Sequence, residues 1–152
     1  TNDDLTKLTK LIIEFKEGLT NFEPEDLKQF RRKEKSIKLI QKSVQEEIQK
    51  PNALFLVAEE KNKLIGFAFG TLKENKHMVF KTVKYGMLNH IWVSKKFREQ
   101  GLSSKFKDEL FKWFNNNNCK YITLLVLDAN PAKQIYEKWG FEIVLDSMEK
   151  II

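Results

Sequence analysis

The chain has 152 residues and a formal net charge of +6, with 27 basic and 21 acidic side chains. A hydrophobic content of 41% is enough for the core of one domain, and no apolar run approaches the roughly 20 residues of a membrane-spanning helix. The opening TNDDLTKL lacks the pattern of a signal peptide and the single Cys119 fits a reducing compartment, so we expect one cytoplasmic domain over residues 1–152, with no membrane partner.

Positive charge is concentrated in the middle of the chain. Residues 52–100 hold 9 basic and 4 acidic side chains, whereas the segments on either side are nearly balanced. A local positive field attracts a nucleic acid, a membrane face or a phosphorylated small molecule, although a solvated lysine-rich surface would give the same numbers. The phenylalanines follow core periodicity, so we expect no nucleic-acid partner. The wide spacing of His77, His90 and Cys119 predicts no metal site.

The first third of the chain predicts helices. Apolar residues between Leu5 and Leu19 recur at three- and four-residue steps, as on an amphipathic helix. Pro24 followed by two acids favours the start of a second helix. The same apolar step returns between Ile37 and Ile48, which predicts a third.

The pattern then changes to that of strands. The runs ALFLVAEE (53–60) and LIGFAFGTL (64–72) are joined by a short polar link and predict an antiparallel hairpin. A third, long strand is expected over residues 81–93, with a kink near Gly86.

Helices and strands alternate in the remainder. LSSKFKDELFKWF (102–114) has its apolar residues on one helical face, residues 121–129 form a buried strand, and residues 130–139 form a short helix closed by Gly140. We expect the final FEIVLD and MEKII to make a hairpin. This order predicts an α/β domain with a mixed, mostly antiparallel central sheet, flanking helices and one strand–helix–strand crossover.

The stretch VSKKFREQGLSSKF (93–106) lies where the third strand ends and the long helix begins. Small residues such as Gly101 and Ser103 leave the first backbone N–H groups of the helix accessible, and Arg98 with the neighbouring lysines adds positive charge. Such a turn favours a cradle for phosphate or pyrophosphate. Ordinary turn and capping residues would give the same spacing.

Together with its flanks, this stretch resembles the GCN5-related N-acetyltransferase (GNAT) superfamily. The family signature is Arg/Gln-x-x-Gly-x-Gly/Ala after a strand, followed downstream by a helix ending in Tyr-x-x-x-Gly-Phe. The chain has R-x-x-G-x-S, later A-x-x-x-Y and then W-G-F, and its LVAEEKNKLIGFAFG looks like the family's usual hairpin. The resemblance covers nearly the whole chain and implies the GNAT-like acyl-CoA acyltransferase fold. The family's first strand normally precedes the first helix, and we expect it to be absent or trimmed here.

The resemblance also implies acetyl-coenzyme A as the cofactor. The backbone that would bind its pyrophosphate belongs to Arg98, Glu99, Gln100, Gly101, Leu102, Ser103 and, opening the helix, Ser104. The backbone that would pair with its pantetheine arm, in the manner of a strand, belongs to Ile91, Trp92 and Val93. Asn130 would either contact the coenzyme, as an asparagine often does in the family, or cap the helix ahead of Pro131.

Direct transfer of an acetyl group to an amine needs a base and an acid. An ammonium acceptor with a pKa near ~10 must lose a proton, and the departing thiolate must gain one. The resemblance implies that Tyr136 protonates the thiolate, although a core aromatic would fit the same position. The family's usual carboxylate base is missing from LNHIWV, and His90, with an ordinary pKa of ~6.5, is the candidate in its place. His90 could instead contact only its strand neighbours or the substrate.

The sequence therefore predicts an N-acetyltransferase that acts on a primary amine of a small molecule or a peptide. The alternative is a non-catalytic acetyl-coenzyme A sensor of the same fold. The sequence does not fix the acceptor, and both a monomer and a homodimer stay open, since dimers are frequent among the proteins that the chain resembles.

Overall fold

The computed structural model describes residues 2–29, 37–76, 78–148 and 150. Its centre is a four-stranded sheet in the order β1-β2-β3-β4. The strands are β1 (Ala53–Glu60), β2 (Lys63–Asn75), β3 (Val83–Val93) and β4 (Ile122–Thr123). The first three pair antiparallel and β4 pairs parallel with β3, so the predicted mixed, mostly antiparallel sheet is confirmed.

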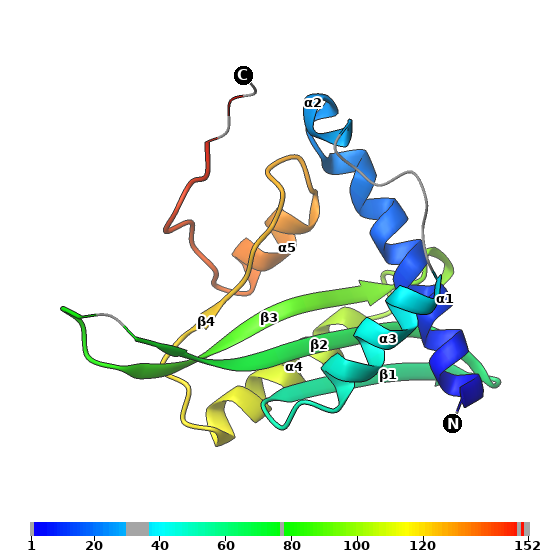
Figure 1. Cartoon of the computed structure of the whole chain (residues 1–152), viewed down its shortest axis with the longest axis horizontal. Coiled ribbons are helices and arrows are strands. Elements are labelled where there is room, and N and C mark those ends of the chain that lie inside the picture. Colours follow the sequence, from blue (N-terminus) through cyan, green and yellow to red (C-terminus); the bar gives the residue numbers. More distant parts are fainter. Residues whose placement is uncertain (1, 30–36, 77, 149, 151–152) are drawn as a thin grey trace.

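Helices cover both faces of this sheet (Figure 1). In chain order they are α1 (Asn2–Leu19), the 3-10 turn η1 (Thr20–Phe22), α2 (Glu25–Lys28), α3 (Ile37–Ile48), the 3-10 turn η2 (Lys95–Phe97), α4 (Leu102–Asn116) and α5 (Ala132–Lys138). Each helix that the sequence predicts is present. None of the helices in the described ranges combines the length and the apolar character that crossing a bilayer requires.

Alternation along β2 divides the core into two layers. Phe67 points to the α1 and α3 side, where its ring meets Phe15 edge-on at 5.6 Å between centroids. Ala68, the next residue, points to the opposite side and packs with Phe106 and Leu110 of α4. Successive side chains of a strand face opposite ways, so a strand covered by helices on both faces is apolar throughout.

Small residues on one face of the sheet let α4 approach the strands closely. A Cβ atom at Gly70 would lie 2.8 Å from the ring of Phe114, and one at Gly86 would lie 2.6 Å from it. Gly66 leaves similar room for Phe106, nearer the start of the helix. The glycines of GFAFG and KYGM therefore mark the line along which α4 lies on the sheet.

The irregular point of β3 is Asn89 rather than Gly86. Neighbouring residues of β2 pair with His90 and then with Leu88, so Asn89 has no partner in the ladder. Such a β-bulge bends its strand and increases the local twist. The kink that the sequence predicts near Gly86 is therefore wrong in position, because Gly86 keeps regular pairing and its missing side chain makes room for the helix.

The strand expected over residues 121–129 is much shorter. Only Ile122 and Thr123 pair with β3, opposite Gly86 and Met87. The bulge at Asn89 bends β3 just beyond this contact. The apolar residues after Thr123 therefore do not pair with β3, and the chain after β4 diverges from that strand.

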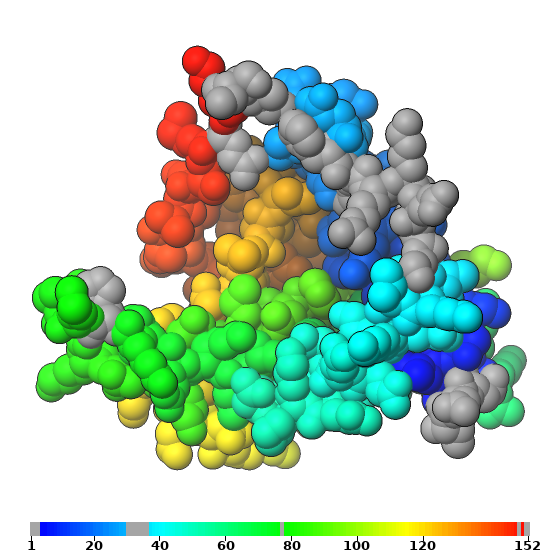
Figure 2. All heavy atoms as spheres, viewed as in Figure 1, coloured from blue at the N-terminus to red at the C-terminus, as the bar shows by residue number. Residues whose placement is uncertain are grey.

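The hairpin expected at the C-terminus does not form within the described residues, although Gly140, with φ of +89°, closes α5 as expected. Residues 142–148 have no strand pairing and expose Ile143, Val144, Leu145 and Met148. Figure 2 shows this segment in red as a separate ridge. A hairpin is marginal in water unless it docks on further strands, and the two residues of β4 offer little to dock on. Three residues of the expected second strand (149, 151 and 152) lie outside the described residues.

Candidate functional site

A tight turn joins the end of β3 to the start of α4. The backbone N–H of Ser94 donates to the carbonyl of Ile65 at 2.8 Å, which holds the end of β3 against β2. After η2 the chain enters the left-handed region twice, at Glu99 (φ +63°) and at Gly101 (φ +77°). Glycine adopts this conformation without strain, so the conformation of the turn, rather than steric crowding, requires Gly101.

This turn presents backbone donors at the start of α4. Lys105 is the first residue whose N–H donates within the helix, to the carbonyl of Gly101 at 3.1 Å, and no side chain caps the helix. The N–H groups of Leu102, Ser103 and Ser104 have no acceptor among the described residues. They lie at the positive end of a helix of 15 residues, which is a favourable place for an anion.

The charged residues of the turn have different partners. The Nε of Arg98 donates to the carbonyl of Val93 at 3.0 Å, so this side chain braces the turn against the strand end. The side-chain amide of Gln100 lies 3.4 Å from the carbonyl of Lys96, a weak contact within the turn. Lys95 and Lys96 are exposed and add positive charge beside the free N–H groups.

The edge of β3 beside this turn is open. On one side Ile91, Trp92 and Val93 pair with Ala68, Phe67 and Gly66 of β2. On the other side β4 reaches only as far as Met87, so no described strand covers the rest of that edge. Since β3 and β4 are parallel, the turn after β3 and the loop after β4 both lie at the carboxyl ends of these strands. In open sheets with crossover connections, ligands bind at the carboxyl ends of the strands.

His90 lies on the face of the sheet that α1 covers. Its ring is 4.9 Å from that of Phe15 and 6.3 Å from that of Phe69, centroid to centroid. Burial is the main cause that lowers its pKa, from 6.5 to about 4. The positive charge of Lys16 lowers this pKa further, whereas the negative charge of Glu47 raises it. The imidazole is therefore neutral at pH 7, and it is a weak base.

Tyr136 lies on α5 in an aromatic group. Its ring is edge-on to Trp139 at 5.7 Å and to Phe141 at 6.2 Å. Burial raises the pKa of its hydroxyl above the ordinary value, so the phenol keeps its proton at neutral pH. The rings around Tyr136 belong to residues that directly follow α5. The rings around His90 belong to α1 and β2, so the two side chains share no ring contact.

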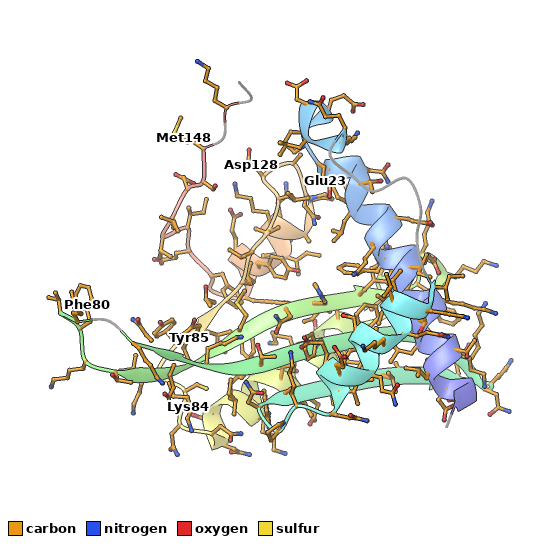
Figure 3. The ribbon with its side chains drawn as sticks, in the orientation of Figure 1. Glu23, Phe80, Lys84, Tyr85, Asp128 and Met148 are labelled. Carbon is orange, nitrogen blue, oxygen red and sulfur yellow. The ribbon has the colours of Figure 1, made fainter. Side chains whose placement is uncertain are left out.

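Asn130 acts as a cap for α5. Its Oδ1 accepts a hydrogen bond from the N–H of Ala132 at 3.0 Å, and its carbonyl accepts one from the N–H of Lys133. Asp128, in the same loop (Figure 3), accepts a hydrogen bond from Lys133 at 2.6 Å. The geometry thus favours the capping alternative for Asn130.

Sequence reasoning missed one polar contact near the site. The hydroxyl of Thr71, which is only 4% exposed, donates to Oδ1 of Asn89 at 3.0 Å. The contact spans β2 and β3 at the bulge. A polar residue in the apolar run LIGFAFGTL is the signal that could have drawn attention to it.

The family comparison agrees with this geometry. A model of the Acetyltransferase (GNAT) family matches residues 18–141. A comparison with curated proteins gave no match.

Solved structures share the fold at low sequence identity. A tetramutant of the BH1408 protein from Bacillus halodurans matches with a TM-score of 0.85 and 18% identity, over 100% of this chain and 96% of that one. A transcriptional regulator from Bacillus halodurans C-125 matches with a TM-score of 0.71 and 15% identity, over 100% and 95%. The aminoglycoside N-acetyltransferase AAC(6')-Iy, in complex with CoA, matches with a TM-score of 0.66 and 17% identity, over 77% and 78%.

At these identities the structural likeness concerns the fold alone. The family model, by contrast, matches well over half of the chain, from the end of α1 to the residue after Gly140, and includes the turn and α5. The resemblance inferred from the sequence is confirmed: the chain belongs to the Acetyltransferase (GNAT) family.

Proposed function

We propose that the protein is an acetyl-coenzyme A-dependent N-acetyltransferase that transfers acetyl to a primary amine by direct attack in a ternary complex. The observation that carries this proposal is the set of free N–H groups at the start of α4, next to the open edge of β3. Membership of an acetyltransferase family and the likeness to an aminoglycoside N-acetyltransferase with CoA support it.

The turn fits a pyrophosphate. The N–H groups of Leu102, Ser103 and Ser104 point from a helix N-terminus, and no atom lies within 4 Å of where a Cβ atom of Gly101 would stand, so the space beside the backbone is open. The backbone from Arg98 to Gly101 completes the cradle, with Glu99 and Gln100 facing solvent. The side chain of Arg98 is proposed to hold the turn in shape, since it is bonded to Val93.

The open edge of β3 fits an extended, amide-containing arm. Main-chain groups of Ile91, Trp92 and Val93 would pair with it as another strand would, because that edge has no described strand beyond Met87. Bound in this way, the coenzyme supplies an acetyl group activated as a thioester. The bulge at Asn89 turns backbone groups out of the ladder, where they can stabilise the oxyanion that develops on the acetyl carbonyl.

Tyr136 is proposed as the proton donor to the departing thiolate. Its raised pKa keeps the hydroxyl protonated at neutral pH, which is the form that can donate. α5 follows the loop after β4, and this loop and the cradle both lie at the carboxyl ends of the parallel strands β3 and β4.

His90 is not proposed as the general base. With its pKa lowered to about 4 by burial, the imidazole is about six units less basic than an ammonium acceptor with a pKa near ~10. We propose instead that water takes the proton of the amine and that His90 packs beneath α1 against Phe15.

A sensor of acetyl-coenzyme A remains the second candidate. One structural neighbour is a transcriptional regulator, and the cradle would bind the coenzyme without any transfer. Release of thiol in a panel of amines, including aminoglycosides, distinguishes the two. Turnover with any amine supports the enzyme, and stabilisation by the coenzyme without turnover supports the sensor.

The binding step has its own test, with a matched control. Gly101→Val forces a β-branched residue into the left-handed region, and Gly140→Val does the same at the end of α5, where there is also no neighbour within 4 Å. We expect both variants to unfold at lower temperature, but only Gly101→Val to lose the stabilisation by acetyl-coenzyme A. A wild-type protein that the coenzyme does not stabilise, or an equal loss in Gly140→Val, would contradict the proposal.

A further inference from the structure

The hairpin of β2 and β3 extends beyond the rest of the sheet. β1 pairs with β2 no further than Thr71, and β4 pairs with β3 only from Gly86 onward. Beyond these points the described residues contain two strands alone, which stay paired as far as Asn75 and Val83. Residues 73–84 are here named the ribbon, and Figure 1 shows it in green, projecting from the sheet away from the helices.

Three consecutive apolar side chains lie at the end of the ribbon. Met78, Val79 and Phe80 are 102%, 79% and 66% exposed, and Figure 3 shows Phe80 at the far end of the hairpin. Neither of the core clusters of the described residues includes them. Single exposed apolar residues are ordinary, but a contiguous apolar end that adds nothing to the core marks an interaction site.

Lysines lie directly behind this apolar end. With four lysines and one acid the ribbon has a net charge of +3; these residues are Lys73, Lys76, Lys81, Lys84 and Glu74. All four lysines are exposed, and Glu74 offsets one of them through an ion pair with Lys76 at 3.8 Å. Lys120 adds a further positive charge at the base of the ribbon, where its backbone N–H donates to the carbonyl of Lys84 at 2.8 Å.

The order of apolar and charged groups along the ribbon matches the layers of a bilayer surface. Apolar side chains of interfacial proteins are buried about 5–10 Å deep, at the boundary of head groups and acyl chains. With the end of the ribbon at this depth, Lys76 and Lys81 are next to the phosphate groups. A strand advances about 3.3 Å per residue, so Lys73 and Lys84 lie roughly 10 Å further back. That distance is within about one Debye length of the charged surface.

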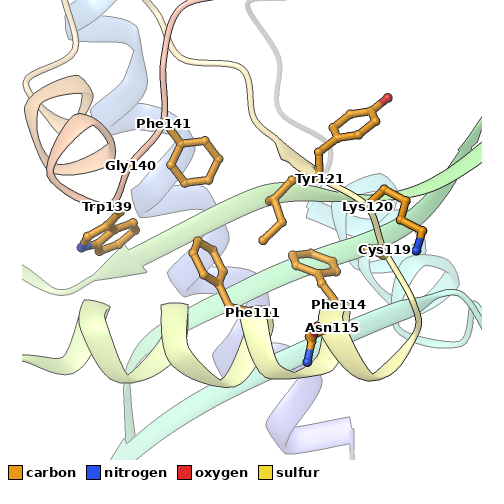
Figure 4. A pocket seen from close by; sticks show the side chains of 10 residues that line it. Phe111, Phe114, Asn115, Cys119, Lys120, Tyr121, Trp139, Gly140 and Phe141 are labelled. Carbon is orange, nitrogen blue, oxygen red and sulfur yellow. The ribbon is translucent and has the colours of Figure 1, made fainter.

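The convex shape of the ribbon favours a partner that can deform. A second apolar surface, a hollow of ≈ 550 Å³ beside the base of the ribbon, is concave and lies between α4, the start of β4 and the end of α5 (Figure 4). Lys120 and Tyr121, which bond to β3 at the base of the ribbon, are in its wall. A hollow can enclose a ligand, whereas the end of the ribbon buries its apolar side chains only by entering its partner.

Nucleic acid is another anionic partner for a lysine-rich ribbon. Specific contacts to bases use mainly Arg, Asn and Gln, and binding of single strands uses aromatic side chains that stack on the bases. The ribbon has no arginine, and Met78 and Val79 offer a base neither a hydrogen bond nor an aromatic face. Three apolar residues in a row therefore favour lipid.

We propose that the ribbon is a peripheral membrane-binding site. Met78, Val79 and Phe80 enter the boundary of head groups and acyl chains in a bilayer rich in anionic phospholipid, and the lysines bind the phosphates. The charges reinforce this shallow insertion, each lysine by about fivefold in affinity. Such a site needs no membrane-spanning segment. It departs from the expectation of no membrane partner, which rested on the lack of a long apolar run.

The bound orientation leaves the proposed phosphate cradle accessible. β3 runs from Val83 in the ribbon to Val93, directly before the turn, so the cradle lies roughly 30 Å from the end of the ribbon. The membrane therefore neither covers the cradle nor needs a bound coenzyme.

Co-sedimentation of the full chain with lipid vesicles is the first test. We expect binding to vesicles of phosphatidylcholine and phosphatidylglycerol in equal parts, no binding to phosphatidylcholine alone, and weaker binding as salt screens the charges. Met78→Ser with Phe80→Ser removes apolar surface and should weaken binding by at least about tenfold. Lys76→Gln with Lys81→Gln keeps the apolar end and should weaken it by roughly 25-fold.

Matched controls remove the same kinds of group elsewhere. Lys61→Gln with Lys63→Gln lowers the net charge equally, at the exposed turn between β1 and β2, which is the other end of β2 from the ribbon. Ile37→Ser with Leu39→Ser removes side chains that are 57% and 59% exposed on α3. Both controls should bind vesicles as the wild type does. The ribbon variants should keep the melting temperature of the wild type and its response to acetyl-coenzyme A, because they change only exposed side chains.

A fluorescent label reports the insertion directly. Val79→Cys in a Cys119→Ser background carries a polarity-sensitive dye, whose emission should shift to the blue on anionic vesicles. The same dye on Asn62→Cys, in the turn between β1 and β2, should not change.

Three results would overturn the proposal: no binding of the wild type to anionic vesicles, equal binding of the wild type and the ribbon variants, or unchanged emission from the label at position 79. Tighter binding to oligonucleotides than to vesicles, lost in Lys76→Gln with Lys81→Gln, would also overturn it and assign the ribbon to nucleic acid. None of these readouts involves acetyl transfer, so the membrane site and the proposed function stand or fall separately.

Discussion

The hydroxyl of Thr71 donates a hydrogen bond to Oδ1 of Asn89 at 3.0 Å, at the residue where the pairing of β2 and β3 slips. Thr71 is almost fully buried, so this bond satisfies a polar group that water does not reach. It ties the bulge, which is proposed to position oxyanion-stabilising backbone groups, to the regular strand beside it.

Loss of this bond should loosen the bulge. Thr71→Val keeps the shape of the side chain and removes the donor, so we expect a loss of stability of about 1 kcal/mol and a fall in kcat with little change in KM for acetyl-coenzyme A. Thr71→Ser keeps the hydroxyl and should retain kcat. Urea unfolding and steady-state kinetics measure both effects. A Thr71→Val protein with normal kcat would show that the bond does not position the reacting groups.

The buried His90 predicts a specific dependence of stability on pH. The native state binds a proton on His90 only below about pH 4, whereas the unfolded chain binds one below its ordinary value of 6.5. Between these values the unfolded state binds more protons, so the free energy of unfolding should fall as the pH is lowered through this window, by up to about 3 kcal/mol. Above pH 7 His90 should contribute no slope.

His90→Gln removes the titrating group and should flatten the pH dependence between pH 6.5 and 4 that is due to this residue. Urea unfolding of both proteins at several pH values provides the measurement. The same variant tests the assignment of the base: its kcat should stay within a few fold of the wild-type value, with the same pH profile. A rise of wild-type activity between pH 6 and 8 that disappears in His90→Gln would restore His90 as the base.

Removal of the Tyr136 hydroxyl should affect the chemical step. We expect Tyr136→Phe to lower kcat by about 100-fold, in line with the contribution of a general acid, and to leave the KM for acetyl-coenzyme A nearly unchanged. Tyr85→Phe is the matched control, because that ring stacks on Tyr121 at 5.0 Å, along β3 before the bulge. Equal kcat values for the Tyr136→Phe and wild-type proteins would leave Tyr136 with a packing role among Trp139 and Phe141.

Two glycine substitutions should change the stability of the protein in opposite directions, because Gly86 lies against α4 and Gly18 has no neighbour. Gly86→Ala would place a Cβ atom 2.6 Å from the ring of Phe114 and should destabilise the protein by roughly 1–3 kcal/mol. Gly18→Ala, near the end of α1 with no atom within 4 Å, should stabilise it by about 0.5–1 kcal/mol. Chemical denaturation of the two variants gives the comparison, and a neutral Gly86→Ala would show that the helix can shift without cost.

Much of the fold could be predicted from local pattern. The helical steps from Leu5 to Leu19 and the run ALFLVAEE are strong signals because each element buries one or both faces in a regular way. The turn around Gly101 could also be predicted, since a glycine between a strand and a helix favours a tight turn, and Gly101 adopts a left-handed conformation there.

The errors arose where structure depends on partners far away in the sequence. The bulge at Asn89 results from a slip between two strands, and nothing in LNHIWV alone locates it. The strand after Tyr121 and the hairpin after Gly140 have good strand composition, but a strand needs a neighbour to bond with, and composition does not say whether one is in reach. The low pKa of His90 also depends on residues far away in the sequence, because burial lowers it and α1 packs on this side chain.

The position of the proposed phosphate cradle depends on contacts that lie some distance from it. A helix is stiff along its axis, and α4 is seated on the sheet near both ends, through Gly66 beneath Phe106 and through Gly70 and Gly86 beneath Phe114. A bulky side chain at Gly86 would push Phe114 away from the sheet and tilt α4 about its contact at Phe106. This tilt would displace the first N–H groups of the helix. Coenzyme affinity should therefore respond to residues that no coenzyme atom touches.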